Sequence, residues 1–223
     1  MARTARVDAG GEFYHVLNRA NGRLKIFEAD KDYQLFEHLL TEAKELTDMR
    51  ILAYVVMPNH WHLVLNPQKD GDLALFLHHL TNAHTRKVHA LTNTNGSGHL
   101  YQGRYKSFLI GQDGYLLTAV KYTERNPVRA DLVPRCEDWR WSSAWRRAHG
   151  TNAQRTLLAE LPETFPRDHV QWINAAEDAG ALELIRASVN KGAPYGKSLW
   201  VEEMVTRFSL ESTQHGVGRP KKQ

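Results

Sequence analysis

Apolar positions along the first two thirds of the chain alternate in some segments and recur at helical spacing in others. Three segments rich in β-branched and aromatic residues predict strands at Phe13 to Asn18, Met49 to Val56 and Trp61 to Leu65. Helical spacing of apolar residues predicts two amphipathic helices, at Ala29 to Thr47 and Asp72 to Leu91. A hairpin is expected between the second and third strands, because a turn-forming Pro-Asn pair separates them.

The pattern continues with a fourth extended segment and a third helix. Tyr101 to Ile110 is expected to be extended, and Asp113 is expected to open a helix that ends near Asn126, because Pro127 follows. The order β-α-β-β-α-β-α predicts an α+β fold, a ferredoxin-like split βαβ sandwich with an antiparallel sheet.

The character of the chain changes after residue 150. Short helices are expected at Asp168 to Asp178, Ala181 to Asn190 and Leu199 to Arg207, with turn residues between the last two. We expect a core domain over residues 1–150, a helical C-terminal appendage over 151–212 and a basic tail over 213–223. The sequence leaves open whether the appendage only packs on the core or also contacts a partner.

Composition narrows the class of protein. The chain has 223 residues, of which 42% are hydrophobic and 24% charged, so it can bury a substantial core. No apolar run approaches the ~20 residues of a membrane helix, and no apolar leader segment is visible, so we expect a cytoplasmic protein without membrane contact. The single cysteine excludes a thiolate metal cluster. The net charge of +4 is a mild indication of a polyanionic partner.

Two histidines stand out at the start of the third strand. His60 and His62 are two residues apart, so strand alternation places both imidazoles on one face of the sheet. Two adjacent imidazoles form half of a metal site, and Mg or Mn would keep open positions for water or phosphate oxygens. His-x-His pairs also occur by chance, so further residues are needed to support the hypothesis.

The end of the third helix supplies those residues. Tyr122 and Asn126 are four residues apart, so a phenol and an amide oxygen would face one site one helical turn apart. A phenol with a pKa near 10 is a weak nucleophile at neutral pH, so a cation that polarises a phosphate would be required. Tyr115 is an alternative nucleophile on roughly the same helix face. Tyr122 is preferred because Tyr115 has Ala119, not an amide, four residues later.

Several motifs occur in the order typical of one family, and the sequence resembles the REP-associated tyrosine transposases, single-tyrosine members of the His-hydrophobic-His (HUH) nuclease superfamily. The motifs are His15-Val16-Leu17-Asn18-Arg19, Val56-Met57-Pro58-Asn59-His60-Trp61-His62, Tyr101-Gln102-Gly103-Arg104-Tyr105, the block from Tyr122 to Ala130, Trp141-Ser142-Ser143, Gly192-Ala193-Pro194-Tyr195-Gly196 and the terminal Gly218-Arg219-Pro220-Lys221-Lys222.

The resemblance implies a function. His60, His62 and Asn126 would hold a Mg or Mn ion against a phosphate of single-stranded DNA folded as palindromic-repeat hairpins, and Tyr122 would attack it. The products would be a 5′-phosphotyrosine link and a free 3′-hydroxyl, with no nucleotide cofactor. The resemblance favours a monomer over a dimer. In a monomer, the histidines and Tyr122 must meet within one chain.

Polar and basic side chains outside the core set are expected to contact DNA, although a solvated surface would explain some of them equally well. They are Arg19, Gln102, Arg104, Lys106, Arg125, Arg129, Arg219, Lys221 and Lys222. Trp139, Trp141 and Trp145 are expected to anchor the segment after the third helix in preference to stacking on bases. The alternative functions are a hairpin-binding regulator without catalysis and a metal phosphodiesterase that uses water.

Overall fold

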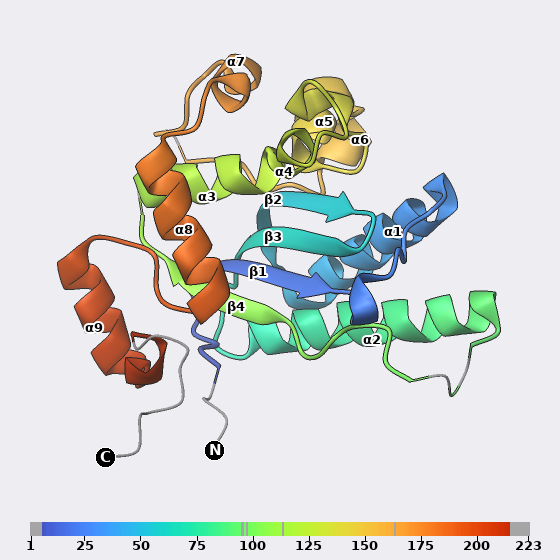
Figure 1. The fold of residues 1–223 in the computed structure, drawn as a ribbon, viewed down its shortest axis with the longest axis horizontal. Helices are drawn as coiled ribbons and strands as arrows, with labels where there is room; N and C mark the ends of the chain where they lie inside the picture. Colours follow the sequence, from blue (N-terminus) through green and yellow to red (C-terminus); the bar gives the residue numbers. More distant parts are fainter. Residues whose placement is uncertain (1–5, 95, 97, 113, 163, 215–223) are drawn as a thin grey trace.

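The computed structural model describes residues 6–94, 96, 98–112, 114–162 and 164–214, and Figure 1 shows their arrangement. The strands are β1 (Phe13–Arg19), β2 (Arg50–Met57), β3 (His60–Asn66) and β4 (Lys106–Ile110). The helices are α1 (Asp30–Thr47), α2 (Asp72–Thr92), α3 (Gly114–Glu124), α4 (Asn126–Arg129), α5 (Ser143–His149), α6 (Asn152–Arg155), α7 (His169–Asn174), α8 (Ala179–Lys191) and α9 (Ser198–Phe208). Short 3₁₀ turns lie at Asn21–Arg23, Cys136–Asp138 and Glu211–Thr213.

The four strands form one antiparallel sheet in the order β2-β3-β1-β4. Together with α1 between β1 and β2 and α2 between β3 and β4, this order is that of a split βαβ sandwich, so the predicted fold class is confirmed. The bounds of β1, α1, β2, β3 and α2 agree with the sequence patterns to within two residues at each end.

The two faces of the sheet are covered by different helices (Figure 1). One face, which includes Trp61 and Leu63, packs against α1 and α2 in the larger hydrophobic cluster. The opposite face, which includes Val64 and Phe108, packs against α3 and α8 in the second cluster. Alternation along each strand therefore sorts the side chains into two cores, and His60 and His62 fall on the α3 side, in line with Val64.

Two expectations about local structure differ from the model. The predicted extended segment from Tyr101 is a strand only from Lys106 onward, and Tyr101 forms one isolated bridge with Ala20. The Tyr101 hydroxyl instead accepts a hydrogen bond from the Trp61 indole and meets His84, inside the α2 core. Burial of this phenol takes the chain out of the sheet for several residues. Asp113, the expected start of the third helix, lies outside the described residues.

The segments after α4 are joined to the sheet by hydrogen bonds and ring stacking. The Trp139 indole donates to the Val56 carbonyl at 2.9 Å, and Trp141 stacks on Tyr33 with ring centroids 4.9 Å apart, so both act as anchors. Beyond α8, Tyr195 pairs with the outer edge of β4 through hydrogen bonds with Leu109 and Gly111. Helices α8 and α9 are therefore joined through the sheet edge and not by a free turn. Within the described residues, no helix combines the length and apolarity needed to cross a membrane.

Candidate active site

The paired histidines lie at the start of β3, near the end of β1. In the antiparallel register, His60 stands opposite Arg19 and His62 stands opposite Leu17. Directly opposed residues share a face of a sheet, so Arg19 and both imidazoles belong to the face that carries α3. The His60 and His62 rings lie 5.1 Å apart, centroid to centroid.

A third histidine, His15 on β1, joins this pair. Its Nε2 lies 3.0 Å from Nδ1 of His62, and its ring stacks on Phe108 of β4 at 4.9 Å. His15 was not predicted to belong to the site, although it lies in one of the motifs given above. The available signal was a polar residue in the middle of a buried strand, but its proximity to His62 depends on the pairing of β1 with β3.

Burial keeps these imidazoles uncharged at neutral pH. Desolvation lowers the pKa of His60 to about 4 and that of His15 to about 3, and it holds the pKa of His62 well below its usual value. The side-chain oxygen Oδ1 of Asn59 lies 2.6 Å from His60 Nδ1, which favours a hydrogen on Nδ1 because an amide oxygen only accepts. The lone pair of His60 Nε2 is then available to a ligand.

Tyr122 of α3 faces the histidine cluster. Its ring centroid lies 6.0 Å from that of His62 and 5.9 Å from that of His15, and the side chain is only 8% exposed. Tyr115, the alternative, packs edge-on against Tyr195 at 5.1 Å, at the far end of the same helix. Tyr115 therefore has a packing role, whereas Tyr122 lies beside the imidazoles.

The helix is interrupted shortly after Tyr122. Helix α3 ends at Glu124 and α4 begins at Asn126, with Pro127, which has no backbone N–H, in its first turn. Burial is the main influence on the pKa of His60, and the Asn126 side chain lies close enough to raise that pKa by hydrogen bonding. The expected meeting of Tyr122, Asn126 and the two histidines thus occurs, but across a break and not along one continuous helix.

Arg129 of α4 packs over the Tyr122 ring. Its guanidinium carbon lies 4.3 Å from the ring centroid, and the same group donates to the Tyr122 carbonyl and to Glu177. Burial raises the pKa of the Tyr122 phenol, and the positive charge of Arg129 opposes this rise, followed by the smaller effect of Arg186. The environment therefore partly offsets the cost of forming a phenolate in a desolvated position.

A fully buried carboxylate fixes the end of α3. Glu124 accepts hydrogen bonds from Ser143 and Arg147, and its other oxygen lies 2.7 Å from His169 Nε2. These interactions outweigh desolvation and hold the pKa of Glu124 below its usual value. The network connects α3 to α5 and α7, and it sets the position of the last turn, which carries Tyr122.

The donor set fits a divalent cation with open positions. Two uncharged imidazoles and one amide converge, and all three are ligands that Mn and related ions accept. In the described part of the chain, no group of three or more His, Cys, Asp or Glu side chains is arranged to hold a metal. An ion at His60 and His62 would therefore also depend on Asn126 and on oxygen atoms of water or substrate.

Comparison with known proteins gives the family. The model described as "Transposase IS200 like" matches residues 12–126, which are just over half of the chain and include Tyr122, Asn126 and both histidines of the His-x-His pair. This chain belongs to the IS200-like transposases.

Two relatives agree with this assignment and with the resemblance found in the sequence. A REP-associated tyrosine transposase of Escherichia coli strain K12 is 26% identical over 139 residues, which cover 61% of this chain and 78% of that protein. The solved structure of a REP-associated tyrosine transposase bound to a REP hairpin has a TM-score of 0.53 and 21% identity. This similarity covers 80% of this chain and 93% of that one, and it supports the same fold.

The residues expected to contact DNA fall into two groups in this transposase. Arg125 and Arg129 are partly buried and both pair with Glu177, at 3.1 and 2.9 Å, so they also have a structural role. Arg19 is partly buried beside His60, and its Nε has no hydrogen-bond partner among the described residues.

The remaining expected DNA contacts are exposed or not described. Gln102 and Arg104 lie on a bend before β4, so they do not share one strand with Lys106, although the whole segment from Tyr101 was expected to be extended. All three are exposed, and Arg104 lines a cleft of about 910 Å³ between α2 and residues 98–105. Arg219, Lys221 and Lys222 lie outside the described residues.

Proposed function

We propose that this transposase is a metal-dependent, single-stranded DNA endonuclease and strand transferase that acts through a covalent 5′-phosphotyrosine intermediate. The observation that carries the proposal is the position of Tyr122, whose ring lies 6.0 Å from that of His62 in the same chain. A buried phenol beside uncharged imidazoles and an arginine suits nucleophilic attack on a phosphodiester.

The reaction exchanges one phosphodiester for another. The Tyr122 oxygen forms a bond to phosphorus, the bond from phosphorus to the 3′-oxygen breaks, and the DNA is left with a free 3′-hydroxyl. The phenol loses one proton and the departing 3′-oxygen gains one. Because the phosphotyrosine retains the energy of the original linkage, a later attack by a 3′-hydroxyl can rejoin strands without a nucleotide cofactor.

His60, His62 and Asn126 are the residues that would hold the cation. A bound Mg or Mn ion would supply positive charge to the phosphate in the transition state. The protein contributes the low pKa values of His60 and His62, which keep both imidazoles available as ligands, and it contributes Arg129, which favours the phenolate. Hydrogen-bonded contact of His15 with His62 fixes the orientation of that ring.

The proposed substrate is single-stranded DNA that contains palindromic-repeat hairpins. The support is the solved relative, which is bound to a REP hairpin, together with the arginines near Tyr122 in this chain. Base pairing in a hairpin stem would give the protein a defined shape to bind, while the adjacent single strand supplies the phosphate for cleavage.

The test is a gel assay of end-labelled hairpin DNA, taken from repeats that flank the gene, with Mg or Mn. We expect wild-type protein to cleave and to become linked to the 5′-phosphate of the downstream fragment, and Tyr122→Phe and His62→Ala to bind without cleavage. Binding by all three proteins with cleavage by none would favour a non-catalytic hairpin-binding protein. Cleavage that survives Tyr122→Phe but not Tyr115→Phe would assign the nucleophile to Tyr115.

A further inference from the structure

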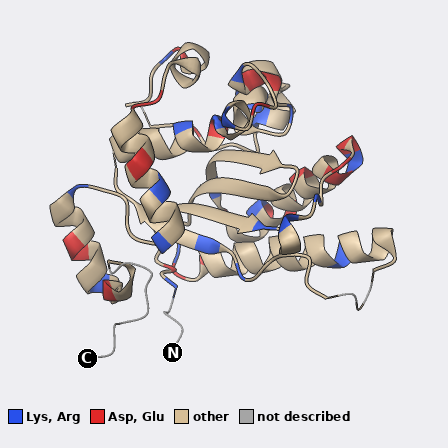
Figure 2. Ribbon diagram, viewed as in Figure 1, with Lys and Arg blue, Asp and Glu red and all other residues tan. Residues whose placement is uncertain are grey.

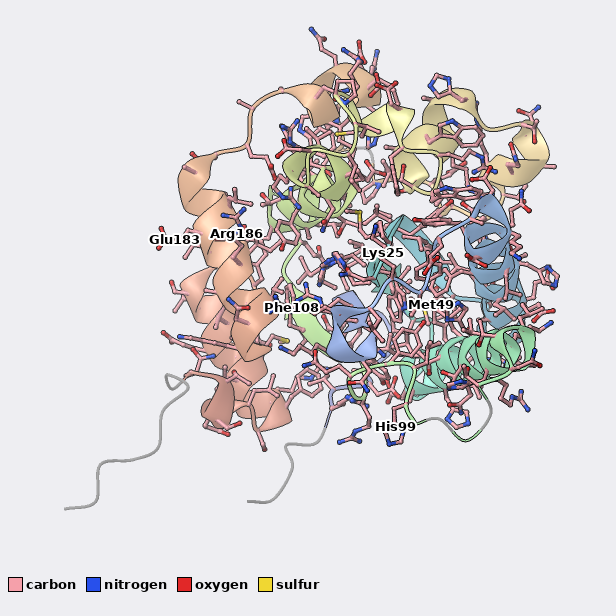
Figure 3. All side chains as sticks on the ribbon, turned by 45° about the vertical axis from the view of Figure 1, so that its right-hand side comes forward. Lys25, Met49, His99, Phe108, Glu183 and Arg186 are labelled. Atoms are coloured by element: carbon pink, nitrogen blue, oxygen red, sulfur yellow. The ribbon has the colours of Figure 1, made fainter. Side chains whose placement is uncertain are left out.

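Helix α8 packs against the same core that holds Tyr122. Its Ile185 is fully buried in the cluster that contains Tyr122, and Leu182 and Val189 pack against that cluster. The positions follow the helical spacing i, i+3 and i+7, so they define one face of α8, which is turned toward α3 and the sheet. Figure 3 shows α8 beside β4, the strand that carries Phe108.

Arg186 belongs to this face of α8. It lies four residues after Leu182 and three before Val189, so helical geometry places it on the packed side of the helix. Unlike its apolar neighbours it is exposed, which puts it at the edge of the packed face. The positive charge of Arg186 also acts on the candidate site: it lowers the pKa of the Tyr122 phenol, which burial raises.

The charge of Arg186 is uncompensated in the described part of the chain, where it makes neither a hydrogen bond nor an ion pair. By contrast, Arg125 and Arg129 share Glu177. Arg19 on β1 is the other arginine that acts on Tyr122 and has no ion pair among the described residues. Two unpaired guanidinium groups, from β1 and α8, therefore act on the residue that attacks the phosphate.

A guanidinium group without an ion pair near the proposed site of cleavage is available to bind a phosphate of the DNA. Guanidinium groups bind phosphate oxygens in a bidentate manner, and each such contact with DNA displaces counterions. The three charged residues of α8, Glu183, Arg186 and Lys191, are spread along the helix (Figure 2), and of these Arg186 is the one at the edge of the packed face.

We propose that Arg186 binds a backbone phosphate of the single strand next to the cleaved one, so that α8 forms one wall of the active site. This inference rests on the proposed function and extends it to a part of the chain beyond residue 126, where the family model ends. It gives the C-terminal appendage a role in substrate binding in addition to packing.

The test measures DNA binding in a Tyr122→Phe background, in which the strand stays intact. The probes are a fluorescent hairpin with a single-stranded flank and the same hairpin without the flank, each titrated at several salt concentrations. We expect Arg186→Gln to weaken binding of the flanked hairpin several-fold and to reduce the slope of log K against log salt by about 0.7, as for one single-strand phosphate contact. Binding of the bare hairpin is expected to be unchanged.

Lys191→Gln is the matched control, because it removes the same charge from the same helix about 140° further round. The inference is overturned if Arg186→Gln binds the flanked hairpin like its parent, or if Lys191→Gln has the same effect. If the protein with Tyr122 intact forms no covalent adduct but Arg186→Gln still reduces the salt slope, the proposed function fails and the phosphate contact stands. If the parent binds neither probe at low salt, both proposals fail.

Discussion

The acidity of the Tyr122 phenol, the proposed nucleophile, depends on a balance between burial and nearby positive charge. Burial raises the pKa of the phenol, while Arg129, in contact with the ring face, lowers it. In a dry environment a fixed guanidinium stabilises a developing phenolate more than it would in water. In the proposed reaction, Arg129 would therefore position Tyr122 and stabilise its phenolate, in addition to its ion pair with Glu177.

Replacing Arg129 is expected to slow cleavage and to change its pH dependence. Arg129→Gln removes the charge over the ring, so the pKa of Tyr122 rises and the rate of adduct formation falls about tenfold for each unit of that rise. The rise of rate with pH should move to higher pH. Arg125→Gln is the control, because Arg125 also pairs with Glu177 but does not contact the Tyr122 ring. Equal effects of the two substitutions on single-turnover rates would show that only the Glu177 pairing matters.

Glu124 stabilises the end of α3 in a pH-dependent way. Its pKa is held low in the folded protein by Arg147, His169 and Ser143, so it contributes stability above its unfolded pKa of about 4.3. That contribution is lost as pH falls through the lower folded pKa. Glu124→Gln is expected to cost about 3 kcal/mol at pH 7, because it leaves Arg147 without its carboxylate. Urea denaturation should show the gap from wild type narrowing below about pH 4, and a gap that is constant with pH would contradict the account.

At the scale of elements, α8 and α3 stabilise each other through the second core. Ile185 is fully buried against the cluster that includes Tyr122, so Ile185→Ala is expected to leave a cavity and to cost about 2–5 kcal/mol. Leu184, its neighbour, is 61% exposed, and Leu184→Ala is expected to change the free energy of unfolding by less than about 0.5 kcal/mol. Urea denaturation compares the two variants, and equal effects would refute the packing of α8 described above.

Most elements of the core were predictable because each carries its own pattern. Alternation marked β1, β2 and β3, and helical spacing marked α1 and α2. Residues 101–105 were mispredicted because two aromatic side chains there suggest a strand, whereas Tyr101 is buried against Trp61 and His84. Such a contact between distant segments leaves no local pattern in the sequence.

The candidate site was predictable only in part, for a similar reason. His60, His62, Tyr122 and Asn126 have informative spacings within single segments. His15 approaches His62 through strand register, and the charge of Arg186 acts on Tyr122 because α8 packs against α3, a helix more than sixty residues earlier in the chain. Pairing and packing of separate segments are not encoded in any one segment, so these two residues emerged from the structure.

At the scale of the whole molecule, one chain contains every residue of the candidate site. Tyr122 meets His62 in cis, so an exchange of α3 between two subunits is not needed. We therefore expect that mixing equal amounts of Tyr122→Phe and His62→Ala restores no cleavage, although each variant binds the hairpin. A dimer that shares its sites would regain one intact site in each mixed dimer. Cleavage by the mixture in the gel assay would therefore contradict assembly of the site within a single chain.

The central claim is that Tyr122 becomes covalently linked to DNA. The most direct measurement is mass spectrometry of the protein after incubation with hairpin DNA and Mn, nuclease trimming and proteolysis. The account predicts that the peptide containing Tyr122 carries a 5′-linked nucleotide, and that Tyr122→Phe protein yields no modified peptide. A nucleotide on another residue, or efficient DNA cleavage without any nucleotide–peptide adduct, would contradict it.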